Sequence, residues 1–320
     1  MSSPPKGVSL RTPAKVNLFL YVRERLPDGY HRLFSLMQMV GLYDRLDLRR
    51  TASRRGVLFS SSGLSLPTGP DNLVVRAARL FLRHYGLKKG VEIRLRKRIP
   101  VSAGLGGGSS DAAGALLGLC RLFGVRPDAT ELIELARRIG SDVPFFLSGP
   151  SALVQGTGER IDATQPDGAG WIVLVNTGEK VSTAWAYREL DRIRLRKKRG
   201  IPVRNRKFWL TTIEKQNKIS ADFRSTFQLK KLSPYLHNDL EEATQRSYPV
   251  IGVVKERLRG LGAAGVLMSG SGPTVFGLFF NPLKARQAAR TLKRENPGWG
   301  VWAVKILNRK PSSIRRSSNR

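Results

Sequence analysis

Residues 100–111 read Pro-Val-Ser-Ala-Gly-Leu-Gly-Gly-Gly-Ser-Ser-Asp, a stretch whose residue types could bind a phosphate group. The glycines leave the backbone bare and permit positive φ, so successive N–H groups can point into one concavity. Ser109, Ser110 and Asp111 occupy positions typical of helix N-caps, where free N–H groups and the helix dipole attract an anion. No Gly-Lys-Ser/Thr follows, and a serine pair replaces the last glycine of a dinucleotide fingerprint, so neither of those motifs is present. The alternative is a flexible turn before a capped helix.

A carboxylate that could accept a proton stands at Asp142, between a helix expected to end at Gly140 and the proline Pro144. The apolar residues 145–147 follow it, which predicts partial burial of the carboxylate. The alternative is an aspartate that only caps a helix.

Lys15 and Asn17 are two residues apart in a predicted strand, residues 13–22, so both lie on one face of it and could address a site. A solvated strand edge is the alternative. Tyr30 and His31 directly follow a Pro-Asp-Gly turn signal. An aromatic ring beside an imidazole could contact a nucleobase, with ordinary packing as the alternative.

The elements that must position these residues follow from hydrophobic periodicity. Alternation over residues 91–96 predicts a strand before the glycine loop, and residues 112–123, rich in helix formers, predict a buried helix after it. The remaining pattern predicts strands at 33–40, 44–48, 152–157, 171–176 and 301–306 and helices at 71–82, 128–139, 183–187 and 282–295. Between the strand that ends at residue 48 and residue 70, the sequence predicts loops. By pattern alone this is a mixed α/β protein with an anion-binding loop.

Composition places the 320-residue chain among soluble globular proteins, with 41% hydrophobic and 25% charged residues. No apolar run approaches the roughly 20 residues that a membrane-spanning helix needs. The single cysteine, Cys120, excludes an internal disulfide framework and a cysteine-rich metal site. The first seven residues lack the apolar core of a secretory signal, so we expect a cytoplasmic protein without a membrane partner.

The formal charge of +32 is unusual and would attract nucleic acid, anionic membranes or phosphorylated substrates. Much of it is concentrated in residues 192–231, with 14 Lys/Arg against two acids, and in residues 305–320, with six Lys/Arg and no acid. A solvated basic insertion and a disordered tail are favoured over a dedicated nucleic-acid site.

Several segments in order along the chain resemble the GHMP kinases, the superfamily of galactokinase, homoserine kinase, mevalonate kinase and phosphomevalonate kinase. The resemblance covers residues 10 to about 308, and its motifs are residues 13–18 (Pro-Ala-Lys-Val-Asn-Leu), the loop 100–111, Gly-Ser-Asp-Val-Pro at 140–144, Asn-Asp-Leu-Glu at 238–241 and the glycine-rich turn at 265–279. The Pro-Asp-Gly-Tyr-His of residues 27–31 is similar to a signature of one branch, the diphosphocytidyl-methylerythritol kinases.

The resemblance implies an α+β, two-domain GHMP kinase fold with the active site in the cleft between the domains. The expected division is an ATP-binding N-terminal domain (1–167), a C-terminal domain (168–310) with the basic insertion 192–231, and a basic tail (311–320). The implied reaction is ATP-dependent phosphorylation of the 2-hydroxyl of 4-diphosphocytidyl-2-C-methyl-D-erythritol in non-mevalonate isoprenoid biosynthesis, with ATP and Mg²⁺ as cofactors.

The resemblance also assigns residues. Asp142 would take the proton of the attacking hydroxyl, and Lys15 would offset charge on the transferring group. The ATP contacts would be Pro100, Val101, Ser102, Ala103, Gly104, Leu105, Gly106, Gly107, Gly108, Ser109 and Ser110, one of the two serines assisting with Mg²⁺, and Asn72 and Lys97 near the adenine. The contacts to the CDP-linked substrate would be Asn17, Tyr30, His31, Thr183 and Tyr187. Asp111 would point away from the phosphates. No protein group is assigned as a metal ligand.

Two other functions stay open at this point. One is a GHMP kinase for another alcohol, such as homoserine or mevalonate. The other is RNA binding through the basic segments, in which case deleting residues 196–230 or the tail would abolish RNA affinity and spare kinase activity. We expect a monomer or a weak homodimer.

Overall fold

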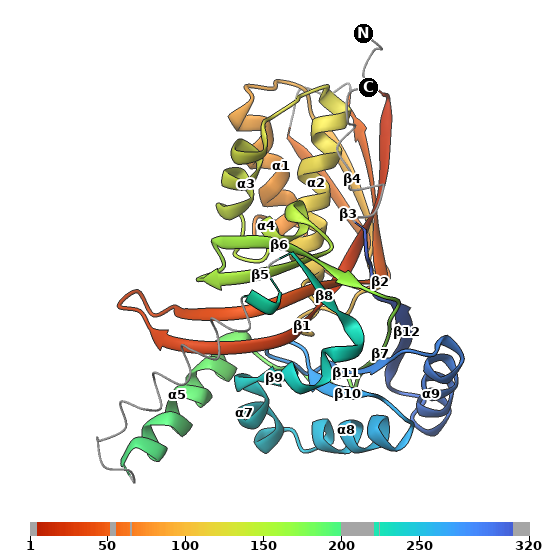
Figure 1. Cartoon of the computed structure of the whole chain (residues 1–320). Helices are drawn as coiled ribbons and strands as arrows, with labels where there is room; N and C mark the ends of the chain where they lie inside the picture. Colours follow the sequence, from red (N-terminus) through yellow and green to blue (C-terminus); the bar gives the residue numbers. More distant parts are fainter. Residues whose placement is uncertain (1–4, 52–55, 65, 200–220, 224, 310–320) are drawn as a thin grey trace.

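The computed structural model describes residues 5–51, 56–64, 66–199, 221–223 and 225–309, excluding the side chains of 197–199. The chain forms a large and a small β-sheet, with helices on the outer side of each (Figure 1). Within the described residues, no helix has the length and apolar character needed to cross a membrane.

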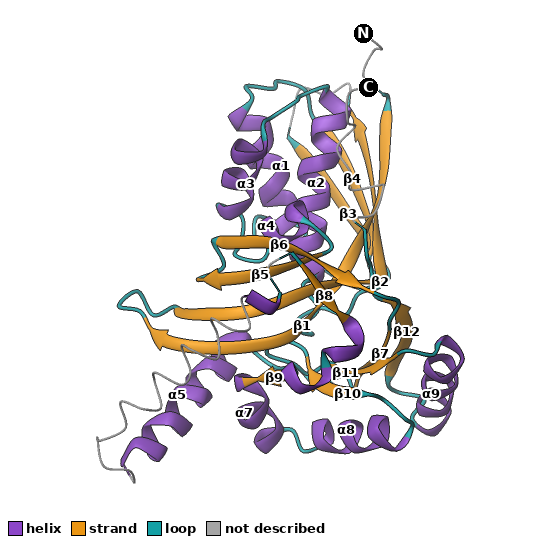
Figure 2. Cartoon of the chain, viewed as in Figure 1, coloured by secondary structure: helices purple, strands orange, loops and turns teal. Residues whose placement is uncertain are grey.

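The large sheet has eight strands and contains most of the first half of the chain. Its hydrogen-bonded order is β3 (Val57–Ser62), β4 (Val91–Arg96), β2 (His31–Arg50), β5 (Ser151–Gly156), β6 (Arg160–Asp167) and β8 (Thr226–Gln228), with β1 (Gly7–Arg25) paired to β2 and to β9 (His237–Asn238). Helices α1 (Leu73–His84), α2 (Gly107–Phe123), α3 (Ala129–Arg137) and α4 (Val143–Ser148) lie on one side of it (Figure 2). Gly114 and Gly118 allow α2 close to the sheet, since a Cβ there would lie 2.4 Å from Thr12 and 2.8 Å from Leu48.

The small sheet is built from the second half of the chain. Its order is β10 (Gly265–Met268), β11 (Val275–Phe279), β7 (Trp171–Asn176) and β12 (Gly300–Lys305). Helices α8 (Val250–Gly260) and α9 (Pro282–Glu295) pack on it, and α5 (Thr183–Arg199) packs on α7 (Asp239–Ser247). Two short 3₁₀ turns, η1 (Leu229–Lys231) and η2 (Ser233–Tyr235), precede β9.

Apolar side chains of the two sheets share one core. Phe19 and Leu36 of the large sheet belong to the same buried cluster as Leu174 and Phe276 of the small one. The predicted domain boundary at residue 168 falls between β6 and β7, but β8 and β9 return to the large sheet. The division at this residue therefore stays a prediction.

Most predicted elements are confirmed, and the differences have local causes. Residues 33–40 and 44–48 belong to one strand, β2, whose pairing with β1 shifts at Pro13/Ala14 instead of breaking. The region assigned to loops contains β3, whose half-exposed Val-Leu-Phe-Ser-Ser-Ser sits at the edge of the sheet. β6 and α8 were not predicted at all.

The prediction that residues 192–231 form a solvated basic insertion is partly wrong. Its start continues α5, and its end packs into the core, with Phe223 and Phe227 only 3% and 4% exposed and Leu229 buried beside them. The high charge of the segment obscured these apolar residues in the sequence. They lie in a short strand and 3₁₀ turns, so their spacing follows no single period. Deleting 196–230 would therefore remove core residues as well as charge. Residues 200–220 and the tail 310–320 lie outside the described residues.

Candidate active site

The glycine loop joins β4 to α2 with a backbone suited to an anion. Gly104 and Gly106 have φ of 73° and 65°, in the left-handed region, and α2 begins at Gly107. Gly106 is the N-cap residue and no side chain caps the helix, so the prediction that Ser109, Ser110 and Asp111 are caps is wrong: they are already helical. The free N–H groups at this end are therefore not occupied by side chains and point to a ligand site.

Packing explains most of the glycines in the loop. A Cβ at Gly104 would lie 2.0 Å from the carbonyl oxygen of Ser269, and one at Gly106 2.9 Å from Cγ of Lys15. At Gly107 it would lie 2.7 Å from Nζ of Lys97, while Gly108 has only ordinary contact. Close approach of the loop to its neighbours thus favours glycine at 104, 106 and 107, whereas packing does not require it at Gly108, which is exposed.

The glycine-rich turn after β10 packs against the glycine loop and is hydrogen-bonded to it. The Ser269 hydroxyl donates to the carbonyl oxygen of Gly104 at 2.9 Å and accepts the backbone N–H of Asn17 at 3.3 Å. The Asn238 amide donates to Met268 O and Gly270 O, both at 2.8 Å. The glycine-rich turn of residues 265–279 therefore packs directly against the phosphate loop.

Lys15 and Asp142 lie beside the loop as a charge pair. Nζ of Lys15 is 3.5 Å from Oδ2 of Asp142, and the backbone N–H of Lys15 donates to Leu105 O at 2.9 Å. The lysine side chain is 6% exposed, whereas the aspartate is 31% exposed and therefore accessible to a substrate. Asp142 precedes α4 but makes no capping hydrogen bond, so capping does not account for it.

Asn17 fixes the direction of the Lys15 ammonium. Its Oδ1 accepts from Nζ of Lys15 at 2.6 Å, and its amide donates to the Ser35 hydroxyl at 2.8 Å. That hydroxyl donates in turn to Phe19 O at 2.7 Å. All four groups are buried, so the ammonium is held rigidly next to the loop.

A second group of side chains surrounds His31. Its Nε2 lies 2.9 Å from Oδ1 of Asp191, and its ring centroid is 5.1 Å from that of Tyr187. Burial, and then the negative charge of Asp142, raise the pKa of the Tyr187 phenol to about 12, so the phenol is neutral at ordinary pH. Tyr30, 65% exposed, stands next to His31 in the chain.

Thr183 contacts the glycine-rich turn of residues 265–279 through its hydroxyl. Its hydroxyl is 3.0 Å from the Ser271 hydroxyl, while Ser182 accepts the N–H of Trp185 at 3.4 Å. Sequence reasoning singled out neither Ser271 nor Asp191. Asp191 lies two helical turns after Thr183 on α5, and this helical spacing was the available signal.

Lys97, Asn72 and Asp111 are occupied by contacts within the protein. Nζ of Lys97 pairs with Asp44 and, at 2.8 Å, with Asp111, and all three side chains are at most 3% exposed. Asp111 also accepts from the Thr12 hydroxyl at 2.6 Å, so it points away from the loop as expected. Asn72 caps α1 through Val74 N and donates to Pro67 O, which leaves its expected adenine contact, like that of Lys97, a prediction.

The remaining loop positions differ in accessibility. Val101 and Ser102 are exposed, Ser102 with φ of 52°, whereas Ala103, Leu105 and Ser110 are buried. Pro100 and Ser109 are half-buried. The outer rim of the loop is therefore open to a ligand, and its inner residues are packed.

Comparison with known proteins agrees with this geometry. A model of the GHMP kinases N terminal domain matches residues 72–150, and one of the GHMP kinases C terminal region matches residues 223–298. The homoserine kinase from Cytophaga hutchinsonii shares the fold, with a TM-score of 0.73 over 97% of both chains at 19% identity. The fold and the loop are those of a GHMP kinase, an ATP-dependent phosphotransferase.

Closer relatives narrow the class. The 4-diphosphocytidyl-2-C-methyl-D-erythritol kinases of Syntrophotalea carbinolica and Geobacter metallireducens are 40% and 43% identical over 94% of this chain and 99% of their own. A crystal structure of 4-(cytidine 5'-diphospho)-2C-methyl-D-erythritol kinase has a TM-score of 0.71 at 36% identity, covering 93% of this chain and 99% of the other. The chain belongs to this family of kinases.

Proposed function

We propose that the protein transfers the γ-phosphoryl group of ATP to the 2-hydroxyl of 4-diphosphocytidyl-2-C-methyl-D-erythritol, in the non-mevalonate route to isoprenoid precursors. The observation that carries the proposal is the Lys15–Asp142 pair beside the glycine loop, with the His31 group next to it. A phosphate site, a base and a candidate nucleobase site are then in one region.

In the proposed reaction, Asp142 takes the proton of the 2-hydroxyl while its oxygen attacks the γ-phosphorus. The bond from that phosphorus to the bridging oxygen breaks, ADP leaves, and Asp142 later releases the proton to water. The ammonium of Lys15 offsets charge on the transferring group, since phosphoryl transfer depends on positioning and electrostatics. The N–H groups at the start of α2 would bind phosphate oxygens.

The residues at the loop fit a magnesium ion that arrives with the nucleotide. The Ser110 hydroxyl is buried and, among the described residues, has no hydrogen-bond partner. The described chain has no cluster of three or more His, Cys, Asp or Glu for a metal, and Mg²⁺ commonly uses one or two protein oxygens plus substrate phosphates. When bound, the ion would neutralise charge on the phosphate oxygens.

Asp191 gives the His31 imidazole a defined orientation for reading the base. A carboxylate only accepts, so Nε2 carries the hydrogen in their 2.9 Å contact, and Nδ1 of a neutral ring is left as an acceptor. An acceptor suits the exocyclic amine of cytosine and opposes the carbonyl that uracil has in its place. Unpaired polar groups then disfavour the wrong base.

Replacing Asp191 with asparagine is expected to raise KM for the CDP-linked alcohol about tenfold with little change in kcat, since about 1.4 kcal/mol of a charge-assisted hydrogen bond is lost. Discrimination against the UDP-linked analogue should fall as well. Steady-state kinetics on both substrates measure this. The control is Glu189→Gln, which removes a carboxylate of the same helix that pairs with Arg192 at 3.1 Å. Equal KM values in wild type and Asp191→Asn would reject the role of Asp191.

ADP release in the presence of a panel of alcohols tests the function itself. We expect turnover with the CDP-linked methylerythritol and none with homoserine or mevalonate. Preference for either of those two alcohols would overturn the proposed substrate and leave the kinase class intact.

A further inference from the structure

One face of the large sheet carries a row of arginines and is covered by no described helix. On β2, Leu46 and Leu48 are fully buried toward the helices, while Arg45 is exposed on the opposite side. On β4, Ile93 is buried and Arg94 is exposed in the same way. We call the exposed side the arginine face; its charged residues are Arg11, Arg45, Arg49, Arg94 and Arg96 with Asp47 and Glu92.

Strand register aligns three of these arginines across adjacent strands. Arg11 of β1 is opposite Arg45 of β2, and Arg45 is opposite Arg96 of β4. Neighbouring strands are about 4.8 Å apart, and like charges directly opposite each other destabilise a sheet. A bound anion would relieve this repulsion.

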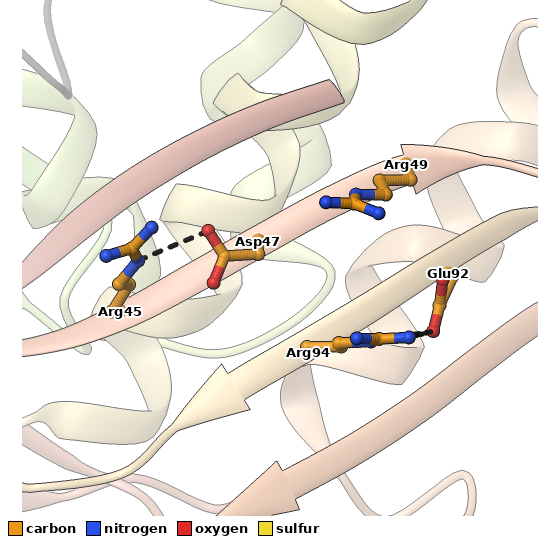
Figure 3. A pocket seen from close by; sticks show the side chains of 5 residues that line it. All are labelled: Arg45, Asp47, Arg49, Glu92 and Arg94. Carbon is orange, nitrogen blue, oxygen red and sulfur yellow. Dashed lines mark hydrogen bonds and ion pairs between the residues drawn. The ribbon is translucent and has the colours of Figure 1, made fainter. Parts of the chain in front are cut away.

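A polar hollow of about 160 Å³ opens next to this row. It is lined by Arg45, Asp47, Arg49, Glu92 and Arg94 (Figure 3). Asp47 and Glu92 pair with Arg45 and Arg94 of their own strands, at 3.2 and 2.7 Å. The register places Arg49 opposite Glu92, but the Glu92 carboxylate pairs with Arg94, and within the part of the chain that the structure describes Arg49 forms no ion pair. The face therefore keeps a positive excess.

We propose that the arginine face binds the phosphate backbone of single-stranded RNA without sequence preference. The net charge of +32 attracts a polyanion to the molecule as a whole, and the aligned arginines provide a local site for it. The ring of Tyr43 is already covered by the guanidinium of Arg11, 4.0 Å from its centroid, so we expect phosphate contacts and not stacking on this ring to carry the binding. An anionic membrane fits less well, since among the described residues of this face Leu58, at the edge of the sheet, is the single large apolar side chain that is exposed.

The proposed RNA site is separate from the phosphate loop. α2 packs on the other side of the same strands, with Gly118 against Leu10 and Leu48. Substitutions on the arginine face should therefore spare kinase activity, and the RNA proposal does not rest on the proposed substrate.

The test measures binding of a fluorescein-labelled 20-nucleotide RNA to the full chain by anisotropy between 50 and 300 mM salt. For the double variant Arg45→Ala/Arg96→Ala we expect affinity about tenfold weaker at 150 mM salt, and a log–log salt slope shallower by about 1.4, for two lost phosphate contacts. Unchanged ADP release confirms that the variant is folded.

The matched control is Arg290→Ala/Arg294→Ala, which removes the same charge from exposed positions of α9. It should change RNA affinity less than twofold. Equal weakening by both double variants would overturn the site in favour of a general charge effect. A wild-type chain that does not bind the RNA at 50 mM salt would overturn RNA binding itself. Loss of binding to anionic phosphatidylglycerol vesicles with RNA affinity retained would reassign the face to a membrane.

Discussion

Replacing Asp142 with asparagine is expected to lower kcat by about 10²–10⁴-fold, because the acceptor of the hydroxyl proton is removed. The two side chains have the same shape, and Asp142 makes no capping hydrogen bond that asparagine would lose. Affinity for the CDP-linked alcohol, which depends on the His31 group, should stay nearly unchanged. ADP release measures kcat, and calorimetry without ATP measures binding.

The control for this prediction is Asp162→Asn. Asp162 is 45% exposed on β6 and pairs with Arg160 at 3.4 Å, so its loss should leave kcat within twofold of wild type. A kcat of Asp142→Asn within twofold of wild type would remove Asp142 from the role of base. A fall in kcat together with lost binding would instead mean that Asp142 holds the substrate.

The local geometry of the site could be predicted where one element carries it. The strand before the loop and the helix after it follow from their periods, and the period of two in β1 places Lys15 and Asn17 on one face. The structure adds that this face is buried, with Lys15 and Asn17 only 4% and 2% exposed. A strand buried on both sides gives no polar alternation from which to predict this.

Contacts between distant segments could not be predicted. The resemblance places Lys97 near the adenine, and no pattern in the sequence indicates its partners Asp44 and Asp111, which are 53 and 14 residues away. The helical spacing from Thr183 could place Asp191 on the same side of α5, but its pairing with His31, 160 residues away, could not be predicted. Spacing reveals partners on one helix or strand, whereas pairs that tertiary packing brings together leave no periodic signal.

The Lys97 cluster supports the loop from both ends. Asp44 accepts the backbone N–H of Ile99 at 2.9 Å, before the loop, and Lys97 binds Asp111 after it. Burial raises the pKa of Asp111 to about 7, against the opposing effect of the Lys97 ammonium, and the charge of Asp44 raises it as well. The Lys97 ammonium therefore offsets the repulsion between the two buried carboxylates, Asp44 and Asp111.

Replacing Lys97 with methionine is accordingly expected to lower the free energy of unfolding by about 3–5 kcal/mol, because removing one partner leaves buried charge uncompensated. Urea unfolding measures the loss, and Lys284→Met, at an exposed position of α9, should change it little. In the variant, the folded state holds a proton on the carboxylate pair that the unfolded chain releases, so its stability falls as pH rises. The gap to wild type should therefore narrow as pH is lowered from 8 to 5.

A second substitution separates charge from packing in the same experiment. Adding Asp111→Asn to Lys97→Met removes one of the two buried carboxylates and should recover part of the lost stability, although Asp111→Asn alone destabilises the wild type by breaking its bonds to Lys97 and Thr12. If the double variant is less stable than Lys97→Met at pH 8, the loss comes from the lysine side chain's packing beneath Gly107 and not from uncompensated charge. Recovery, by contrast, would mean that uncompensated buried charge causes the loss, and that the ion cluster at the two ends of the phosphate loop stabilises the fold through charge balance.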